Sequence, residues 1–365
     1  MAYPARRRGS KAKGIQFTVM VVGASGTGRT TFVNTLCESE VLTHKDTTNP
    51  EVAVSEAGIA IKPVNVDIQE EGMRINLTVV DTPGFGDNID SNLAFQEIVT
   101  YLERQYDDIL AEQSRIRRNP KFRDNRVHAL LYFIQPGGHA LREIDIVLMQ
   151  KLSHRVNVIP VIGRSDSLTV SELSSFKKRI MEDIQHYDIP IYNFPCDVEE
   201  DDEETIQENM ELRALMPFAV IGSEEELEIN GEFVRGRVYP WGVVEVDNPN
   251  HCDFARLKSA LFSSHLHDLR SLTENILYEA YRTEKLSKTI YPEASDMSIA
   301  PEDMASQSFR LKEEQIRKDE EKLREIELRV QREINDKRQQ LLAKEESLRN
   351  LESRLGAQGT SSPTF

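Results

Sequence analysis

The stretch Gly23-Ala24-Ser25-Gly26-Thr27-Gly28-Arg29-Thr30 decides the fold class of this chain. It follows a short apolar run, Phe17–Val22, and precedes residues with helical spacing. It matches the phosphate-binding loop pattern G-x-x-x-x-G-K-[ST], except that Arg29 replaces the lysine. The glycines allow backbone N–H groups to turn toward phosphate oxygens, and the helix N-terminus adds to their attraction. The stretch predicts a strand, a phosphate-binding loop and a helix; the alternative is a glycine-rich turn without a nucleotide.

A second motif, Asp81-Thr82-Pro83-Gly84, follows the predicted strand Asn76–Val80. An aspartate at that place can hold the water shell of Mg²⁺, and the hydroxyl of Thr30 can bind the same ion. The backbone amide of Gly84 can detect a γ-phosphate. The sequence therefore predicts Thr30 and Asp81 as the magnesium ligands.

A third motif, Gly163-Arg164-Ser165-Asp166, follows the predicted strand Val156–Ile162. GTPases carry [NT]-K-x-D here, and its aspartate accepts hydrogen bonds from N1–H and N2–H₂ of guanine. Gly163 and Arg164 weaken this motif when it is taken alone. The three motifs in order, each at a strand end, favour guanine and make a P-loop ATPase the weaker alternative.

The rest of the chain to about Leu286 alternates between strand-like and helix-like stretches. Such alternation predicts an α/β fold of the P-loop GTPase type, a mostly parallel sheet with helices on both faces. One long amphipathic helix is expected over Phe254–Leu286. The further predicted strands are Ile59–Gln69, which pairs with Asn76–Val80 as a hairpin, Leu130–Ile134 and Ala219–Ile221.

The C-terminal part has a different character. Residues 287–308 contain prolines and serines and are expected to form a linker. Residues 309–355 place apolar side chains seven apart, with one shift of four after Val330, which predicts a coiled coil with one stutter. A lone solvated helix is the alternative. Residues 356–365 are expected to be disordered.

Composition limits the classes of function. The chain has 365 residues and a net charge of −16, which argues against a nucleic-acid partner. No apolar run approaches the roughly 20 residues of a membrane helix, so no transmembrane segment is expected. The three cysteines suit a reducing compartment. A basic arm over residues 1–14 carries Arg6, Arg7, Arg8, Lys11 and Lys13.

The stretch Val234–Asp247, followed by His251–Leu257, resembles the septin-specific element, and Asp81–Asp87 also matches septins. The chain therefore resembles a septin over almost its whole length. The resemblance implies a septin-type GTP-binding domain over residues 15–286, with the specific element at about 222–286. Arg29 and the Gly163–Asp166 variant are most like the fungal septin at the ends of the hetero-octamer.

The resemblance also implies roles for single residues. Trp241 falls in the interface that forms across the nucleotide, although a lone tryptophan is more often buried core. The basic arm is similar to the septin segment that docks on anionic phosphoinositide membranes, with a solubilising tail as the alternative. The implied nucleotide-binding residues are Gly23, Ala24, Ser25, Gly26, Thr27, Gly28, Arg29, Thr30, Thr31, Gly84, Arg164, Ser165, Asp166, Gly222 and Arg237.

Three departures argue against efficient hydrolysis of GTP. Phe85 stands where small GTPases carry the glutamine that orients water. The family's switch threonine falls on Gly58 by spacing, although Thr47 and Thr48 lie nearby, and Arg29 is the third departure. We expect hydrolysis to be slow or absent, with no confident catalytic residue.

We therefore expect a cytoplasmic, cytoskeletal subunit that binds GTP or GDP, with Mg²⁺ accompanying GTP. It would assemble with other septins, and with a coiled-coil partner, into rods and filaments. These would lie at the cell cortex, division septum or bud neck and support cytokinesis, septation and polarised growth. The alternative is a cycling P-loop GTPase switch that controls a partner.

Overall fold

We describe the chain from a computed structural model, which covers residues 14–44, 61–70, 72–82, 84–85, 91–119, 122–196, 202–229 and 231–290. Nothing is stated for the side chains at 91, 92 and 288–290. The chain divides into two compact units, Met1–Ser287 and Lys288–Phe365, and nearly all the described residues belong to the first. The predicted basic arm (apart from residue 14), the linker beyond residue 290, the coiled coil and the tail lie outside the described residues.

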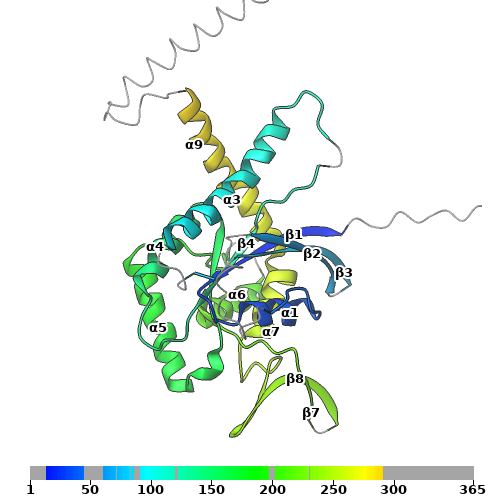
Figure 1. Ribbon diagram of the computed structural model, residues 1–365, viewed down its shortest axis with the longest axis vertical. Helices are drawn as coiled ribbons and strands as arrows, with labels where there is room; N and C mark the ends of the chain where they lie inside the picture. Colours follow the sequence, from blue (N-terminus) through cyan, green and yellow to red (C-terminus); the bar gives the residue numbers. More distant parts are fainter. Residues whose placement is uncertain are drawn as a thin grey trace, which may run out of the picture. The chain divides into compact units, whose positions relative to one another are not determined.

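A six-stranded sheet forms the centre of the first unit, in the order β2-β3-β1-β4-β5-β6. Strands β1 to β4 are labelled in Figure 1. All neighbouring strands are parallel except β2, which pairs with β3 as an antiparallel edge hairpin. The predicted mostly parallel sheet and the predicted hairpin are confirmed. The strands are β1 (Ile15–Gly23), β2 (Lys62–Glu70), β3 (Met73–Asp81), β4 (Ala129–Ile134), β5 (Asn157–Ile162) and β6 (Phe218–Ala219).

The central strands are buried on both faces, because helices cover each side. Along β1, Phe17, Val19 and Val21 belong to one hydrophobic core, and Met20 and Val22 belong to the other. Successive residues of a strand point to opposite faces, so near-continuous apolar runs serve both cores at once.

The two cores are completed by different helices. The first core takes Phe32, Val33 and Leu36 from α1 (Arg29–Cys37), Leu212 from α6 (Glu203–Leu215) and residues of the C-terminal helical run. The second core takes Phe95, Phe176 and Leu148, among others, from three helices. These are α3 (Ser91–Gln113), α4 (Glu143–Ser153) and α5 (Val170–His186).

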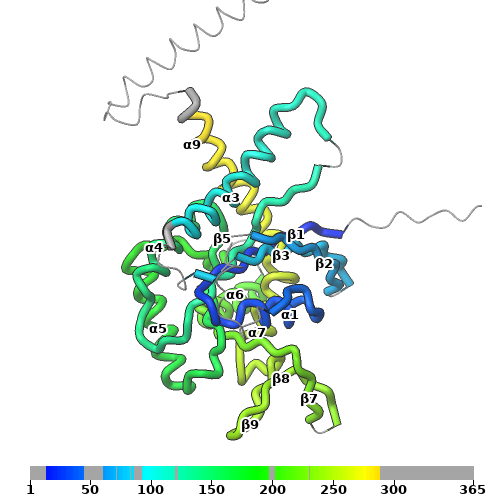
Figure 2. The backbone as a smooth tube through the Cα atoms, viewed as in Figure 1, coloured from blue at the N-terminus to red at the C-terminus, as the bar shows by residue number. Residues whose placement is uncertain are grey.

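A separate three-stranded antiparallel sheet follows β6, and in Figure 2 it projects away from the central sheet. The middle strand is anchored at its base, because the Ser223 hydroxyl donates to the Gly236 carbonyl over 2.6 Å. The β8–β9 hairpin closes with the pair Tyr239 and Gly242, so Pro240 and Trp241 form its turn. The strands are β7 (Glu226–Ile229), β8 (Glu232–Tyr239) and β9 (Gly242–Glu245).

The prediction of a single long helix over Phe254–Leu286 is wrong in detail. The helical run is interrupted at His265, whose backbone N–H donates to the Ala260 carbonyl, one residue farther back than in an α-helix. Such wide turns insert an extra residue, which the apolar spacing alone does not reveal. The run consists of α7 (Phe254–Ser259), a π-helical turn (Ala260–Ser264), α8 (Leu266–Leu272), a second π-helical turn (Thr273–Tyr278) and α9 (Glu279–Ile290).

No helix in the described part of the chain is long and apolar enough to cross a membrane.

Candidate nucleotide-binding site

The predicted phosphate-binding loop connects β1 to α1, as its sequence pattern requires. Gly26 and Gly28 have φ angles of 74° and 86°, a left-handed conformation that glycine adopts without a steric penalty. The Thr27 side chain is buried, and its hydroxyl donates to the Ala24 carbonyl over 2.8 Å. The loop is therefore preshaped, with the first turn of α1 directly behind it.

This loop is joined to the second motif by backbone hydrogen bonds. Ser25 N–H donates to the Phe85 carbonyl over 3.2 Å, and Phe85 N–H donates to the Gly23 carbonyl over 3.4 Å. Gly84 lies so close that a Cβ atom there would be 2.9 Å from Ser25 Cα. The structure thus brings Gly84 to the loop, and the Ser25 amide of the loop is used within the protein; contact of Gly84 with a γ-phosphate stays a prediction.

Arg29 does not extend along the loop as the lysine of the standard pattern would. Its Nη1 donates to the Thr82 carbonyl over 2.8 Å and lies 3.4 Å from the Thr82 hydroxyl. That hydroxyl donates in turn to the Val21 carbonyl over 2.8 Å. Arginine has a wide, planar donor head, which suits it to bridge from α1 to the end of β3. Thr82 is a site contact that the sequence did not reveal.

The third motif packs directly on the loop. A Cβ atom at Gly163 would lie 2.2 Å from the Thr27 carbonyl oxygen, so no larger residue fits there without displacing the loop. Arg164 has a φ of 51°, and its Nη1 donates to the Gly26 carbonyl over 3.3 Å. Ser165 Oγ is buried and has no hydrogen-bond partner among the described residues. Close packing therefore explains why glycine, and not the Asn or Thr of the GTPase motif, stands at position 163.

Asp166, the predicted guanine acceptor, is held by residues of β8. Its side chain is only 6% exposed, and Arg237 Nη1 lies 3.7 Å from its Oδ2 atom. The Tyr239 hydroxyl donates a hydrogen bond to the same oxygen. Burial, and then the hydrogen bond to the Asp166 carboxylate, raise the pKa of Tyr239, so the phenol remains protonated and a donor at neutral pH. The structure brings Asp166 and Arg237 together, while their roles toward a base stay predictions.

Tyr239 also connects the site to the surface. Its ring stacks on Trp241, with ring centroids 5.0 Å apart and planes 3° from parallel. Trp241 is 79% exposed, so it does not take the buried core position that is usual for a lone tryptophan. Sequence reasoning missed Tyr239, although it lies two residues from Arg237 and alternation along a strand places the two on the same face.

The residue types of the site fit a guanine nucleotide, and those described beside the loop are closely packed. Arg164, Gly222 and Arg237 enclose a cavity of about 10 Å³ beside the loop, near the smallest volume that holds one water molecule. Gly222 allows this closeness, since a Cβ atom there would be 2.9 Å from the Phe32 backbone nitrogen. The Asp166 Oδ2 atom, which could accept a hydrogen bond from a purine base, is already bonded to the Tyr239 hydroxyl.

A family model described as Septin matches residues 13–295. The chain belongs to the septin family. It is 51% identical over 349 residues to septin homolog spn3 of Schizosaccharomyces pombe, covering 95% of this chain and 92% of that protein. It is 49% identical over 286 residues to cell division control protein 11 of Saccharomyces cerevisiae, covering 77% and 69%. A crystal structure of Cdc11 from Saccharomyces cerevisiae matches with a TM-score of 0.51 and 41% identity, covering 74% of this chain and all of that one.

These findings confirm the septin resemblance and the P-loop GTPase-type fold. Septins are GTP-binding cytoskeletal proteins of cell division, which supports guanine as the base that this septin's site is built for. Thr30 lies in the first turn of α1 and Asp81 ends β3, so both magnesium candidates lie beside the loop. Their binding of Mg²⁺ stays a prediction. Among the described residues, no group of three or more His, Cys, Asp or Glu side chains is placed to hold a metal.

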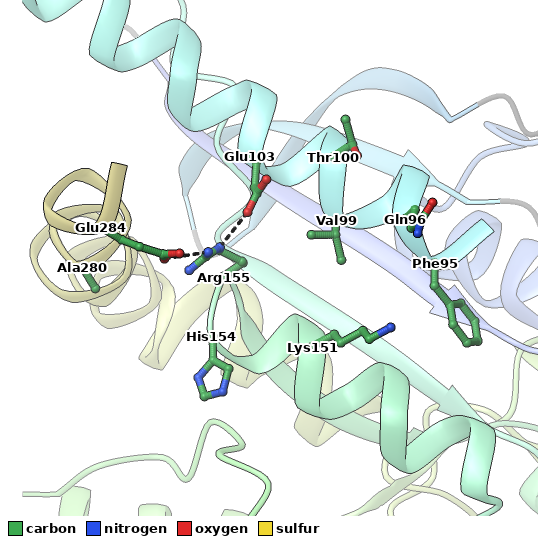
Figure 3. Close-up of a pocket in the computed structure, with 10 residues that line it drawn as sticks. All are labelled: Phe95, Gln96, Val99, Thr100, Glu103, Lys151, His154, Arg155, Ala280 and Glu284. Carbon is green, nitrogen blue, oxygen red and sulfur yellow. Dashed lines mark hydrogen bonds and ion pairs between the residues drawn. The ribbon is translucent and has the colours of Figure 1, made fainter. Parts of the chain in front are cut away.

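The septin fold also contains a larger cavity, of about 710 Å³, between α3, α4 and α9 (Figure 3). Arg155 lines it between two carboxylates and pairs with Glu103 of α3 over 3.1 Å and with Glu284 of α9 over 2.8 Å. His154 and Lys151, from the C-terminal end of α4, line the same space. The paired charges join α9 to the domain, and none of the three predicted motifs reaches this cavity.

Three tyrosines, Tyr106, Tyr278 and Tyr281, strengthen the joint between α3 and the C-terminal helical run. The Tyr278 hydroxyl donates to Gln113 over 2.6 Å, and the Tyr281 hydroxyl donates to Asp107 over 2.8 Å. Tyr106 packs against both other rings at 5.2 and 5.7 Å. Aromatic packing combined with satisfied hydroxyls makes this a firm attachment of α9 to the GTPase-type domain.

Proposed function

We propose that this septin is a structural subunit of hetero-oligomeric rods and filaments, and that its guanine nucleotide is an interface cofactor. The observation that carries the proposal is Trp241, a large aromatic side chain held 79% exposed at the tip of a hairpin. Its stacked partner Tyr239 bonds to Asp166, so the exposed surface and the nucleotide site share one hairpin. Large exposed aromatic residues are typical anchors of protein–protein interfaces.

The contacts around Phe85 support slow or absent hydrolysis. Phe85 is 3% exposed and packs against Phe95 and Tyr132, with ring centroids 5.5 and 6.2 Å away. A buried phenyl ring cannot orient an attacking water. The Arg29 head is bonded to the Thr82 carbonyl, so part of its hydrogen-bonding capacity is already used within the protein. The alternative function, a cycling GTPase switch, is therefore the less supported; Thr47, Thr48 and Gly58 lie outside the described residues.

The remaining parts of the proposal rest on the sequence pattern. Thr30 and Asp81 would hold Mg²⁺ when GTP is bound. The heptads over residues 309–355 would pair with a partner coiled coil, and the basic arm Arg6–Lys13 would dock on a phosphoinositide membrane. The subunit would then act in the cytoplasm at the cell cortex, division septum or bud neck.

Assembly and turnover together test the proposal. The full chain is sedimented with partner septins at low and high salt, and GTP turnover is measured on the same material. We expect salt-sensitive assembly, because exposed charges are screened within about 10 Å at 0.1 M salt. We expect turnover far below the roughly 10 s⁻¹ typical of enzymes. Rapid turnover with no assembly at any salt concentration would favour the switch.

A further inference from the structure

We infer that Tyr239 is an internal cap on the guanine-binding end of the site, and that its hydroxyl sets how tightly this septin takes up a guanine nucleotide. The inference rests on the proposed nucleotide site and adds a residue that controls it.

The cap acts through a shared acceptor. A guanine base presents two N–H donors, from N1 and N2, to one aspartate carboxylate. Here the Asp166 carboxylate already accepts the Tyr239 hydroxyl and lies 3.7 Å from the Arg237 guanidinium. Hydrogen bonds to a charged acceptor are stronger than neutral ones, so the Tyr239 hydroxyl holds the carboxylate firmly, and the nearby Arg237 charge adds an ion pair. Guanine and the Tyr239 hydroxyl therefore compete for the same oxygen.

The backbone directs Tyr239 at Asp166. Arg235, Arg237 and Tyr239 alternate along β8 and share its inner face. Arg235 fixes the base of the hairpin, because its Nη1 donates to the Thr35 carbonyl over 2.9 Å and its Nη2 lies 3.1 Å from Asp247. Only the tip, with Tyr239 and the Pro240-Trp241 turn, has to move for the acceptor to open.

The small cavity beside the loop agrees with a closely packed site. The cavity of about 10 Å³ at this end of the site is bounded by Arg237 on the hairpin side and by Arg164 on the loop side. In the proposed cap, a guanine base reaches the Asp166 oxygen only in molecules in which the hairpin tip has moved outward. The apparent affinity is then lowered in proportion to how rarely that open form occurs.

The variant Tyr239→Phe tests the inference, because it removes the hydroxyl and keeps the ring that stacks on Trp241. GDP binding to the full chain is measured by titration calorimetry, with ADP as a comparison. We expect Tyr239→Phe to bind GDP about tenfold more tightly than the parent, which corresponds to about 1.4 kcal/mol. We expect no comparable gain for ADP.

A matched control and a double variant complete the design. Tyr187→Phe removes the hydroxyl of an exposed tyrosine at the end of α5 and should leave GDP binding unchanged. Adding Asp166→Ala to Tyr239→Phe should abolish the gain, since the acceptor itself is lost. In the parent, the single tryptophan reports the motion directly, so GDP should change Trp241 fluorescence with the same affinity that calorimetry gives.

The possible results distinguish a failure of the proposed Tyr239 cap from a failure of the proposed nucleotide site. Equal or weaker GDP binding by Tyr239→Phe would overturn the cap and leave the proposed nucleotide site standing. An absence of GDP binding by the parent and by Tyr239→Phe at millimolar concentration would overturn the site itself, and the cap with it.

Discussion

Arg29 and Thr82 are joined by a hydrogen bond of 2.8 Å, from a guanidinium in the phosphate-binding loop to a backbone carbonyl at the end of β3. The residue that would normally attract phosphate thus fastens the loop to the neighbouring strand. Opening the phosphate end of the site therefore costs the free energy of this hydrogen bond. That cost is separate from the one at the guanine-binding end, where Tyr239 contacts Asp166.

Replacing Arg29 by lysine should change stability and binding in opposite directions. Lysine keeps the charge and reaches β- and γ-phosphates, but it cannot reproduce the planar bridge to Thr82. We expect Arg29→Lys to lower the free energy of unfolding by about 1 kcal/mol and to raise GTP affinity. Urea unfolding and calorimetry would measure the two effects. Arg179→Lys, which loses bonds to the Gly138 and His139 carbonyls away from the loop, is the matched control. Unchanged GTP affinity in Arg29→Lys would refute the expectation.

Gly163 is expected to be intolerant of any side chain. An alanine Cβ would lie 2.2 Å from the Thr27 carbonyl oxygen and 3.0 Å from the Phe133 ring, so the loop must shift. We expect Gly163→Ala to lower the free energy of unfolding by about 2 kcal/mol or more. Gly137→Ala is the control, since its nearest atom would be 3.9 Å away. Equal midpoints of urea unfolding for the two variants would show that the loop yields easily.

His128 makes stability depend on pH. Burial lowers its pKa from 6.5 to about 4, and its Nδ1 accepts a hydrogen bond from Thr18 N–H over 2.9 Å, which requires the neutral ring. The unfolded chain therefore takes up a proton first, and stability is lost as pH falls from about 6.5 toward 4. Between pH 7 and 5 we expect a loss of about 2 kcal/mol from this residue.

Glutamine at position 128 offers an acceptor that does not titrate, so His128→Gln should flatten this part of the stability profile. His186→Gln changes an exposed histidine and should leave the profile as it is. Guanidinium or urea unfolding at half-unit steps of pH gives the comparison. A parent profile that is flat between pH 7 and 5 would contradict the assignment.

Trp241 should matter for assembly and little for folding. Because the side chain is 79% exposed, Trp241→Ala should change the free energy of unfolding by less than about 0.5 kcal/mol. Association with a partner septin should weaken by about 2 kcal/mol, the size expected of an interface anchor. Sedimentation with partner septins measures this, and Phe233→Ala, which alters a 73% exposed side chain at the other end of β8, serves as the comparison. Equal weakening by both would argue that the hairpin contributes only general apolar surface.

Local sequence patterns were sufficient to predict most of the sheet. The runs Phe17–Val22 and Leu130–Ile134 are apolar on every residue or nearly so, because both faces of their strands are covered. The phosphate-binding loop was predictable because its glycines and its place between strand and helix are both local features. The interruption at His265 was not, since the extra residue in a wide turn leaves the hydrophobic pattern almost unchanged.

The contacts that close the site join residues far apart in the chain. Arg29 and Thr82 are 53 residues apart, and Asp166 and Tyr239 are 73 residues apart. No spacing rule connects such pairs, and their side chains are equally suited to contact a nucleotide or each other. Only the three-dimensional arrangement distinguishes these possibilities.

With the proposed cap, the stacking of Tyr239 on Trp241 would make the hairpin tip a two-way thermodynamic link. A protein that binds Trp241 and draws the tip outward uncovers Asp166, and by reciprocity a guanine nucleotide that displaces Tyr239 strengthens binding of that protein by the same factor. The concentration of guanine nucleotide in the cell would then influence which subunits join, with no bond of the nucleotide being broken.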